Sequence, residues 1–351
     1  MPTGKNIGPM KWNLVLKNIK TPLQQFPDNN YKLTHSQSTM YKLYLLCTIG
    51  FALFNLAAVA QTDIPDKIKK PQTYELKSGK AIMKISANGG RIVSFSLDDH
   101  ECLTTASQHQ NFGSTLWTAP QSDWGWPPYA VLDQDEYLVE QMGDKLKMKS
   151  NPDPKSGFQI EKSWQPIGDQ SIRIEYTIRN ISESEKAVGP WEVTRVPCGG
   201  IAFFPDGDNA KIPESSLKPD MHKKGINWIS INKTPIPEHQ KLFSTASDGW
   251  LAYELNGILF LKQFPDTKPE NYSPQQAEVE IYTRNDKSYS ELENHGAYRV
   301  LQPGESTSYS VTWSLVTVPP KVKTNEGSRK LTSFTRKQLT LNNTAKPLVR
   351  Q

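Results

Sequence analysis

Apolar and polar residues alternate along most of the chain between residues 75 and 318, and this is what most limits its fold. A period of two is the pattern of β-strands that bury one face, and the segments 172–178 and 309–315 show it most clearly. Turn residues separate the runs; Asn256-Gly257 is a strong two-residue hairpin signal between 250–255 and 258–264. At least ten such strands without an internal repeat predict an all-β fold, a large antiparallel β-sandwich over 75–318.

The distribution of charge argues against a nucleic-acid partner. The formal charge of +5 comes from the two ends of the 351-residue chain. Residues 1–60 hold six Lys and one acid, and residues 319–351 hold eight Lys or Arg and one acid. Residues 61–318, with eight of the nine Trp, hold 27 Lys or Arg against 34 Asp or Glu. A nucleic-acid binder is expected to carry positive charge on its folded part, so this class is excluded.

The N-terminal region predicts export. An apolar stretch follows Lys42 and ends in Ala58-Val59-Ala60, the arrangement of a secretory signal peptide. We expect a signal peptide over 40–60, cleavage after Ala60, and a secreted or periplasmic protein without a membrane span after cleavage. Residues 1–39 would be a disordered upstream extension if Met40 is the true start. The alternative is an uncleaved membrane anchor, because the stretch is close to the ~20 residues that a span needs.

Two features of the exported chain complete this outline. Cys102 and Cys198 could pair or stay free, and nothing in the sequence decides between them. The tail over 319–351 is polar and basic, and we expect it to be mostly disordered. Its weak helical stripe, Leu331, Phe334 and Leu339, allows a short docked helix.

The segment 111–128 interrupts the alternating pattern with three Trp and several Gly and Pro. Trp124 and Trp126 are rigid aromatic residues that lie close in sequence to Gln121 and Asp123. Aromatic faces stack on the C–H groups of sugars, and amide or carboxylate groups bond the hydroxyls. The segment predicts a carbohydrate-binding loop, or else a loop whose Trp residues close one end of the sandwich.

A second segment, 189–200, places Glu192 and Thr194 on one face of an extended run and Trp191 and Arg195 on the other. A carboxylate close to a guanidinium could set an acid or base beside an anion clamp. The alternative is a structural Glu–Arg bridge between strands.

A third candidate is the hairpin formed by 278–283 and 289–295. Each strand has a polar face on which Glu and Tyr alternate, and the carboxylates would repel one another if all were dry and ionised. The face is either solvated or the lining of a polar cleft with perturbed pKa values. The residues of interest are Glu280, Tyr282, Glu291, Glu293 and His295, with Lys262 as a possible counter-charge.

The sequence predicts no metal and no cofactor. No His pair stands at helical ligand spacing, and there is no phosphate loop, dinucleotide fingerprint or Ser nucleophile elbow.

Taken in order, several of these segments resemble one family. They are Gly-Gly-Arg-Ile, Ala-Pro-Gln…Trp-Gly-Trp-Pro-Pro, Pro-Trp-Glu-Val-Thr-Arg, Gly-Trp-Leu-Ala-Tyr and Glu-Leu-Glu-Asn-His-Gly…Leu-Gln-Pro-Gly-Glu-Ser. Over about 75–318 the chain resembles a secreted bacterial family known only as a domain of unknown function. That family is assigned a galactose-mutarotase-like, or aldose 1-epimerase-like, supersandwich.

The resemblance implies a direction for the chemistry. Aldose mutarotases on this fold open a sugar ring with a His acid and a Glu base, and the base lies on a late strand. By strand order Glu291 or Glu293 is similar in placement to that base. Trp191-Glu192 stands where the His is expected, so ordinary mutarotase chemistry would need Glu192 as a buried acid with a raised pKa. The same superfold also serves as accessory domains, so fold alone does not define function.

Three hypotheses follow. In the first, Glu192 and Glu291 or Glu293 form the acid–base pair of an epimerase-like isomerase or a polysaccharide lyase-like enzyme. Arg195 and Lys262 would hold a hydroxyl, ring oxygen or uronate carboxylate, and Trp124 and Trp126 would stack on the sugar. The remaining substrate contacts would be Gln121, Asp123, Glu280, Tyr282 and His295.

The second hypothesis is a non-catalytic carbohydrate-binding protein, and the third is a structural envelope protein. Convergence of Glu192 and Glu293 on one sugar carbon would favour the enzyme; side chains on opposite faces would favour binding alone. The sequence leaves the sugar and the oligomeric state open.

Overall fold

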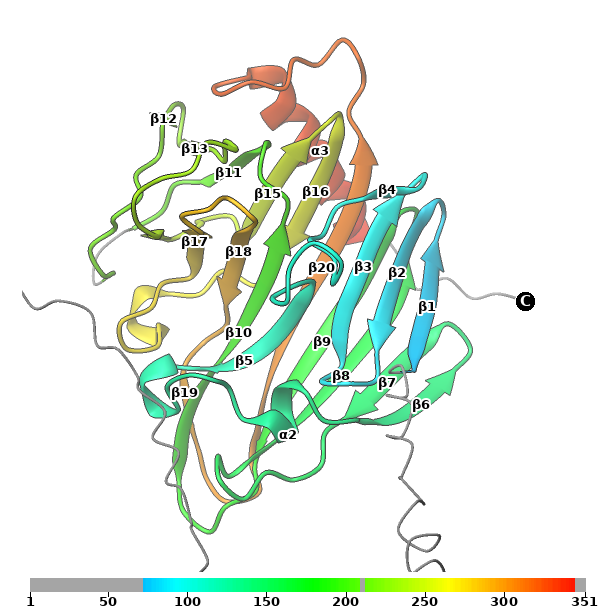
Figure 1. Ribbon diagram of the computed structural model, residues 1–351, viewed down its shortest axis with the longest axis vertical. Coiled ribbons are helices and arrows are strands. Elements are labelled where there is room, and N and C mark those ends of the chain that lie inside the picture. Colours follow the sequence, from blue (N-terminus) through cyan, green and yellow to red (C-terminus); the bar gives the residue numbers. More distant parts are fainter. Residues whose placement is uncertain (1–71, 209–211, 345–351) are drawn as a thin grey trace, which may run out of the picture. The chain divides into compact units, whose positions relative to one another are not determined.

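The computed structural model describes residues 72–208 and 212–344. They form two ten-stranded antiparallel sheets packed face to face (Figure 1). The predicted all-β sandwich is therefore confirmed. The predictions for 1–39 and for the signal peptide or anchor at 40–60 concern residues outside the described part. No helix within 72–208 or 212–344 is long and apolar enough to cross a membrane.

The first sheet carries the site described below. Its order is β1-β2-β3-β5-β10-β18-β17-β14, with β4 beside β3 and β19 beside β10. The bounds, in chain order, are β1 (Thr73–Ser78), β2 (Ala81–Ser86), β3 (Arg91–Leu97), β4 (His100–Glu101), β5 (Ser114–Ala119), β10 (Lys186–Val196), β14 (Gln240–Ser244), β17 (Val279–Thr283), β18 (Ser290–His295) and β19 (Arg299–Leu301).

The second sheet closes the sandwich from the other side. Its order is β12-β13-β11-β15-β16-β20-β9-β8-β7-β6. The bounds are β6 (Leu138–Met142), β7 (Lys145–Lys149), β8 (Phe158–Ile167), β9 (Ser171–Asn180), β11 (Ile201–Pro205), β12 (Met221–His222), β13 (Ile226–Ser230), β15 (Trp250–Leu255), β16 (Ile258–Gln263) and β20 (Ser306–Thr317).

The main core lies between the sheets and follows the alternation seen in the sequence. On β9 and β20 the predicted apolar faces, including Ile174, Tyr176, Val311 and Trp313, are buried. The hairpin of β15 and β16 turns at Asn256-Gly257 as predicted, and both residues have the positive φ that a tight hairpin turn requires.

Short helical segments complete the chain. Three short segments lie in connections between the two sheets: the 3-10 turns η1 (Gln121–Asp123) and η2 (Pro269–Asn271) and the single-turn helix α2 (Ala130–Asp133).

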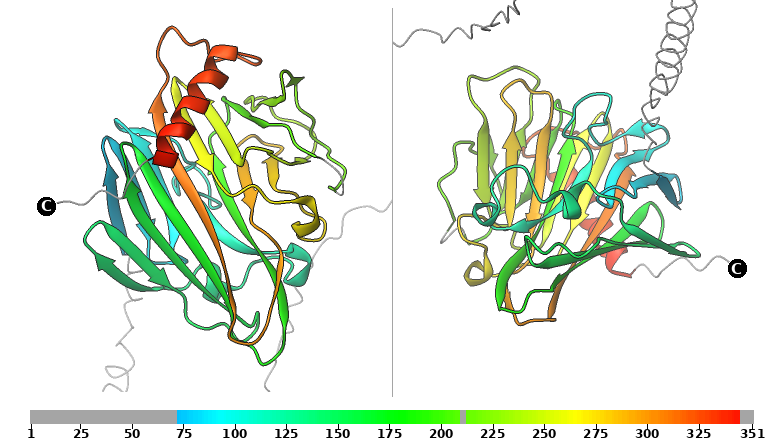
Figure 2. Two further views of the ribbon diagram at one scale, coloured as in Figure 1. Left: turned by 180° about the vertical axis from the view of Figure 1, so that it is seen from behind. Right: turned by 60° about the horizontal axis from the view of Figure 1, so that its bottom comes forward.

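The tail differs from the prediction of mostly disordered chain. Residues Arg329–Thr344 form the 16-residue helix α3, which crosses the outer side of the second sheet when seen from behind (Figure 2). Leu331 and Leu339 are buried there against Trp228 and Trp250. The predicted stripe is thus the apolar face of a complete helix. This face packs on the second sheet, while the polar face of the helix stays in water.

The sequence left open whether the two cysteines of the sandwich pair, and the structure shows that they do not. Cys102 and Cys198 are both free thiols.

Candidate functional site

Strand β10 divides its side chains between the interior and the outer face of the first sheet. Trp191, Val193 and Arg195 point outward, where they meet β5 and β18. Glu192 and Thr194 point inward, as the sequence pattern predicted for opposite faces. All five are less than 4% exposed, because loops cover the outer face as well.

Across β18 and β17 the register brings acidic residues together. His295 stands opposite Trp191 and Glu293 opposite Val193. Glu280 of β17 is in turn the direct partner of Glu293. Three titratable side chains from two strands therefore share one small area of the outer face.

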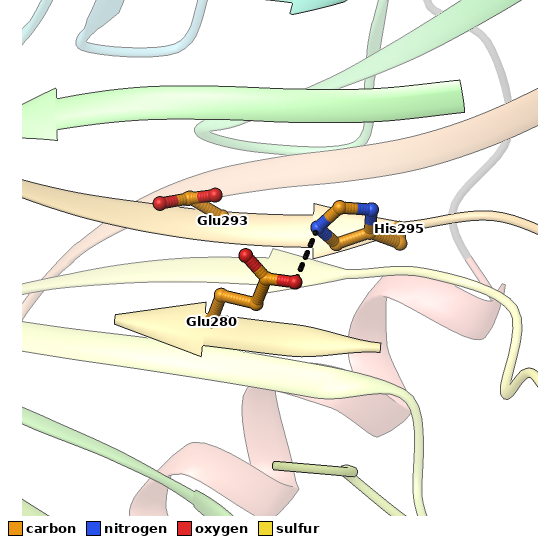
Figure 3. Close-up of side chains that lie close together, drawn as sticks. All are labelled: Glu280, Glu293 and His295. Atoms are coloured by element: carbon orange, nitrogen blue, oxygen red, sulfur yellow. Dashed lines mark ion pairs between the residues drawn. The ribbon is translucent and has the colours of Figure 1, made fainter. Parts of the chain in front are cut away.

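These three residues and Lys241 of β14 form what we call the acid cluster (Figure 3 shows Glu280, Glu293 and His295). Lys241 Nζ lies 2.5 Å from Glu280 Oε2 and 3.1 Å from Glu293 Oε2. His295 Nε2 lies 3.3 Å from Glu280 Oε1. The side chains of both Glu residues are fully buried, whereas the side chain of Lys241 is 26% exposed. The lysine is thus the member nearest to solvent.

The two carboxylates of the acid cluster differ in charge. Burial raises the pKa of Glu293, and the nearby Glu280 and Glu291 oppose the lowering effect of Lys241. Burial would also raise the pKa of Glu280, but Lys241 and His295 outweigh it and hold that pKa below its usual range. Near neutral pH this arrangement gives a protonated Glu293 beside an ionised Glu280.

Hydrogen bonds place the proton of Glu293 on one oxygen. Its Oε2 accepts bonds from Trp191 Nε1 at 2.6 Å and from Lys241 Nζ at 3.1 Å. Its buried Oε1 has no hydrogen-bond partner in the described part of the chain. The proton therefore belongs on Oε1, which leaves a donor free for a ligand.

Glu280 also orients His295. Burial lowers the pKa of His295 despite the nearby Glu280, so the ring is neutral at pH 7. The 3.3 Å approach of Nε2 to Glu280 Oε1 favours the tautomer with its proton on Nε2, although neither ring nitrogen makes a regular hydrogen bond among residues 72–208 and 212–344. In this tautomer the buried Nδ1 carries the lone pair. A free acid and a free base thus stand two residues apart on β18.

Glu192 does not belong to this group. Its carboxylate lies between the sheets and accepts hydrogen bonds from Tyr176 Oη at 2.6 Å and Trp313 Nε1 at 3.2 Å. Lys262 Nζ, also fully buried, lies 2.9 Å from it. The pairing of Glu192 with Glu291 or Glu293 expected from the sequence is not formed, because the side chains lie on opposite faces of the sheet. Lys262 likewise contacts Glu192 in the core rather than the outer face.

The predicted pair of Glu192 and Arg195 is replaced by a pair of Arg195 and Glu291. Arg195 Nε lies 2.9 Å from Glu291 Oε1, so the guanidinium pairs with a neighbouring strand and not with Glu192. Tyr282 stands opposite Glu291 on β17 and is half-buried.

Aromatic rings wall one side of the acid cluster. Trp117 and Trp191 meet edge to face with ring centroids 5.2 Å apart, and Trp191 stacks on His295 at 5.4 Å. From the predicted loop, Trp124 is anchored by its Nε1 bond to Thr118 O at 2.7 Å. Trp126 meets Trp117 at 5.8 Å but is 62% exposed, so it is the ring most available for stacking.

The loop separates three cavities and distributes the predicted residues among them. Gln121 and Trp126 line a cavity of about 440 Å³ with Lys241 and Glu280 at its wall, which we call the acid cavity. Asp123 and Trp124 line another, of about 260 Å³. The third, of about 300 Å³, has Trp126 and Arg195 in its lining, and we call it the arginine cavity. Gln121 and Asp123 therefore face different spaces.

Sequence reasoning missed two contributors. Lys241 lies on β14, where nothing in the surrounding residues 240–244 marks it as special. Asp133 follows the Trp-rich loop and accepts bonds from Trp117 Nε1 at 2.9 Å and Arg91 Nη2 at 2.9 Å. The only signal for Asp133 in the sequence is its position a few residues after the Trp-rich loop.

The acid cluster has the donor atoms of a metal site. Ligand atoms of Glu280, Glu293 and His295 lie within 4.8 Å of one another. However, the ammonium of Lys241 already pairs with the ionised Glu280 and contacts Glu293, from the position that a cation would take. The cluster is better described as an ion-pair network than as a metal centre.

Solved structures place the sandwich in a known class. A galactose mutarotase related enzyme from Lactobacillus acidophilus is 10% identical, with a TM-score of 0.51 over 72% of this chain and 100% of that one. The Slr1438 protein of Synechocystis sp. PCC 6803 is 17% identical, with a TM-score of 0.50 over 71% and 96%. At these identities the likeness concerns the fold, which is the galactose-mutarotase-like supersandwich.

The amino-acid sequence identifies the family of the chain. Residues 73–316 match the family described as "Domain of unknown function (DUF4380)", and the chain belongs to this family. No curated protein sequence matches the chain.

Proposed function

We propose that this protein binds a sugar over the outer face of the first sheet and catalyses proton transfer at its anomeric centre. The observation that carries this proposal is a pair of buried atoms on β18 without a hydrogen-bond partner among the described residues, Glu293 Oε1 and His295 Nδ1. Their side chains contact Lys241 and Glu280, which line the acid cavity. A neutral acid and a neutral base on one side of a ring are the groups that ring opening requires.

The chemistry follows from the assigned protons. Glu293 Oε1–H donates its proton to the ring oxygen as the bond from that oxygen to the anomeric carbon breaks. His295 Nδ1 takes the proton of the anomeric hydroxyl, whose oxygen becomes the carbonyl of the open sugar. Rotation about the neighbouring bond and the reverse transfers give the other anomer. Glu280 holds the His tautomer, and Trp126 supplies a face for the sugar.

A second function is favoured by burial. Glu293 is 0% and His295 2% exposed, and Lys241 lies between Glu293 and solvent. A sugar held by Trp126 and Lys241 alone would be bound without turnover. Turnover requires that the sugar draw Lys241 aside.

We further propose that the protein is exported with cleavage after Ala60. The support is the apolar stretch ending in Ala58-Val59-Ala60. N-terminal sequencing of protein recovered from cells should begin at Gln61; a chain that begins at Met1 or Met40 would contradict this proposal.

The test of function is exchange between sugar anomers, measured by NMR on the full chain with a panel of aldoses. We expect exchange faster than in buffer, with a bell-shaped pH dependence. The rate should fall in alkaline solution as Glu293 loses its proton and in acid as His295 gains one. Glu293→Gln removes the donated proton with little change in shape and should lower the rate about 100-fold or more.

The matched control is Glu175→Gln. Glu175 lies exposed on β9 of the second sheet, and its loss should leave exchange unchanged. Binding with no exchange in the wild type would support the non-catalytic function. Exchange that survives in Glu293→Gln would contradict the assigned acid.

A further inference from the structure

The arginine cavity differs in chemistry from the acid cavity beside it. Its polar lining consists mainly of amides and guanidinium groups, with the carboxylate of Asp133 already held by Arg91 at 2.9 Å. The polar residues that line it are Ser86, Asn88, Arg91, Gln110, Asn111, Asp133, Gln134 and Arg195. Such a surface suits a ligand that carries hydroxyls and a negative charge.

Arg195, which lines this cavity, has a buried donor without a partner among the described residues. The residue is 1% exposed, and its Nε lies 2.9 Å from Glu291. Its Nη1 has no hydrogen-bond partner in the part of the chain that the structure describes. A buried charged donor that makes no hydrogen bond is energetically costly. An acceptor from a ligand would therefore be bound strongly here, and a carboxylate best matches the planar fork of a guanidinium.

Trp126 connects the two cavities. It lines both, and its ring is 62% exposed. The neighbouring Pro127 and Pro128 line only the arginine cavity, and Gly125 only the acid cavity. A ligand that fills both spaces must cross the indole, as two linked sugar rings on either side of it would.

We propose that the arginine cavity is a second subsite, which binds an acidic sugar linked to the sugar that occupies the acid cavity. The ligand would be an oligosaccharide containing a uronic acid, with the uronate carboxylate on Arg195 Nη1 and Trp126 between two units. This inference rests on the proposed function, because it extends the same binding face by one sugar.

The test compares uronic acid disaccharides with their methyl esters, which have nearly the same size and hydroxyl pattern but no charge. The panel contains gluco-, galacto- and manno-configured uronates and matching neutral disaccharides, titrated calorimetrically into the full chain. For the configuration that binds, we expect the free acid to bind at least about tenfold more tightly than its ester, as for a charge-assisted hydrogen bond.

Three variants localise the effect. Arg195→Gln should bring the ratio of acid to ester affinity close to one, while the exposed Arg173→Gln on β9 should leave the ratio as in the wild type. Glu293→Gln should keep the preference for the acid. The ratio of acid to ester affinity in the wild type is measured without any variant, so it tests the proposal even if Arg195→Gln does not fold.

The outcomes separate the two proposals. Disaccharides that bind with equal affinity as acid, ester and neutral sugar overturn the second subsite but leave the proposed function intact. Absence of binding by every sugar in the panel overturns both. A preference for the acid that persists in Arg195→Gln overturns the assignment of the carboxylate to Arg195.

Discussion

Replacing Lys262 by Met would test whether the inward side of β10 is structural. Lys262 Nζ lies 2.9 Å from Glu192 Oε2 and donates hydrogen bonds to Thr194 Oγ1 at 2.8 Å and to the Leu292 carbonyl at 2.9 Å. Burial lowers the pKa of Lys262, and Glu192 counteracts this shift. Met has a similar length but no charge, so the substitution removes the interaction while largely conserving volume.

The structure sets the expected magnitude. After Lys262→Met, Glu192 keeps its bonds from Tyr176 and Trp313 but stays buried without an opposite charge. Breaking a buried pair in this way costs about 3–5 kcal/mol of unfolding free energy, a large part of the ~5–15 kcal/mol that a typical protein has. The double variant Lys262→Met with Glu192→Gln removes the lone charge, and should recover about 1–3 kcal/mol.

The measurement is urea unfolding followed by tryptophan fluorescence, with Lys84→Met on the exposed face of β2 as the control. A loss below about 1 kcal/mol for Lys262→Met, or no recovery in the double variant, would refute the reasoning. Normal stability combined with lost sugar binding would instead restore Lys262 as a substrate contact.

Two further predictions concern stability elsewhere. Burial lowers the pKa of Lys162 to about 7, so the unfolded chain binds more protons between about pH 7 and 10; this residue should make stability rise with pH by at most about 1.4 kcal/mol per unit. In urea unfolding at pH 7 and 9, Lys162→Met should remove that rise, and an unchanged rise would contradict the assignment. Leu331→Ala should lower the free energy of unfolding by about 2–5 kcal/mol, because Leu331 is fully buried on the inner face of α3. Leu341→Ala, 53% exposed on the same helix, should stay within about 0.5 kcal/mol in thermal unfolding, and equal losses would mean that α3 is not docked as described.

Sequence reasoning succeeded where a strand has one apolar and one polar face. On β9 and β20 the alternation identified the buried side because the opposite side is polar. It also grouped the residues of β10 and of the late hairpin by face. These groupings, with the turn at Asn256-Gly257, follow from local geometry and need no tertiary information.

The site itself required the tertiary structure. Both faces of β10 are buried and both carry polar residues, so no contrast in hydrophobicity showed that Glu192 points inward and Arg195 outward. Lys241 reaches the carboxylates of the acid cluster from a strand about 40 to 50 residues away in sequence. Only the register between β14, β17 and β18 brings them together, and register cannot be deduced from a strand that is buried on both sides.

The two-sided burial of β10 has a consequence for how this family can vary in length. A single residue inserted or deleted within β10 would reverse the faces of the residues on one side of the change, so that Arg195 would turn into the interior or Glu192 toward the outer face. Short insertions beside the exposed Trp126 would change the mouth of the cavities and leave the register of the strands intact. Relatives of this chain should therefore tolerate gaps beside Trp126 and none between Pro190 and Val196, and a functional variant with one residue added inside that stretch would contradict the assignment of the two faces.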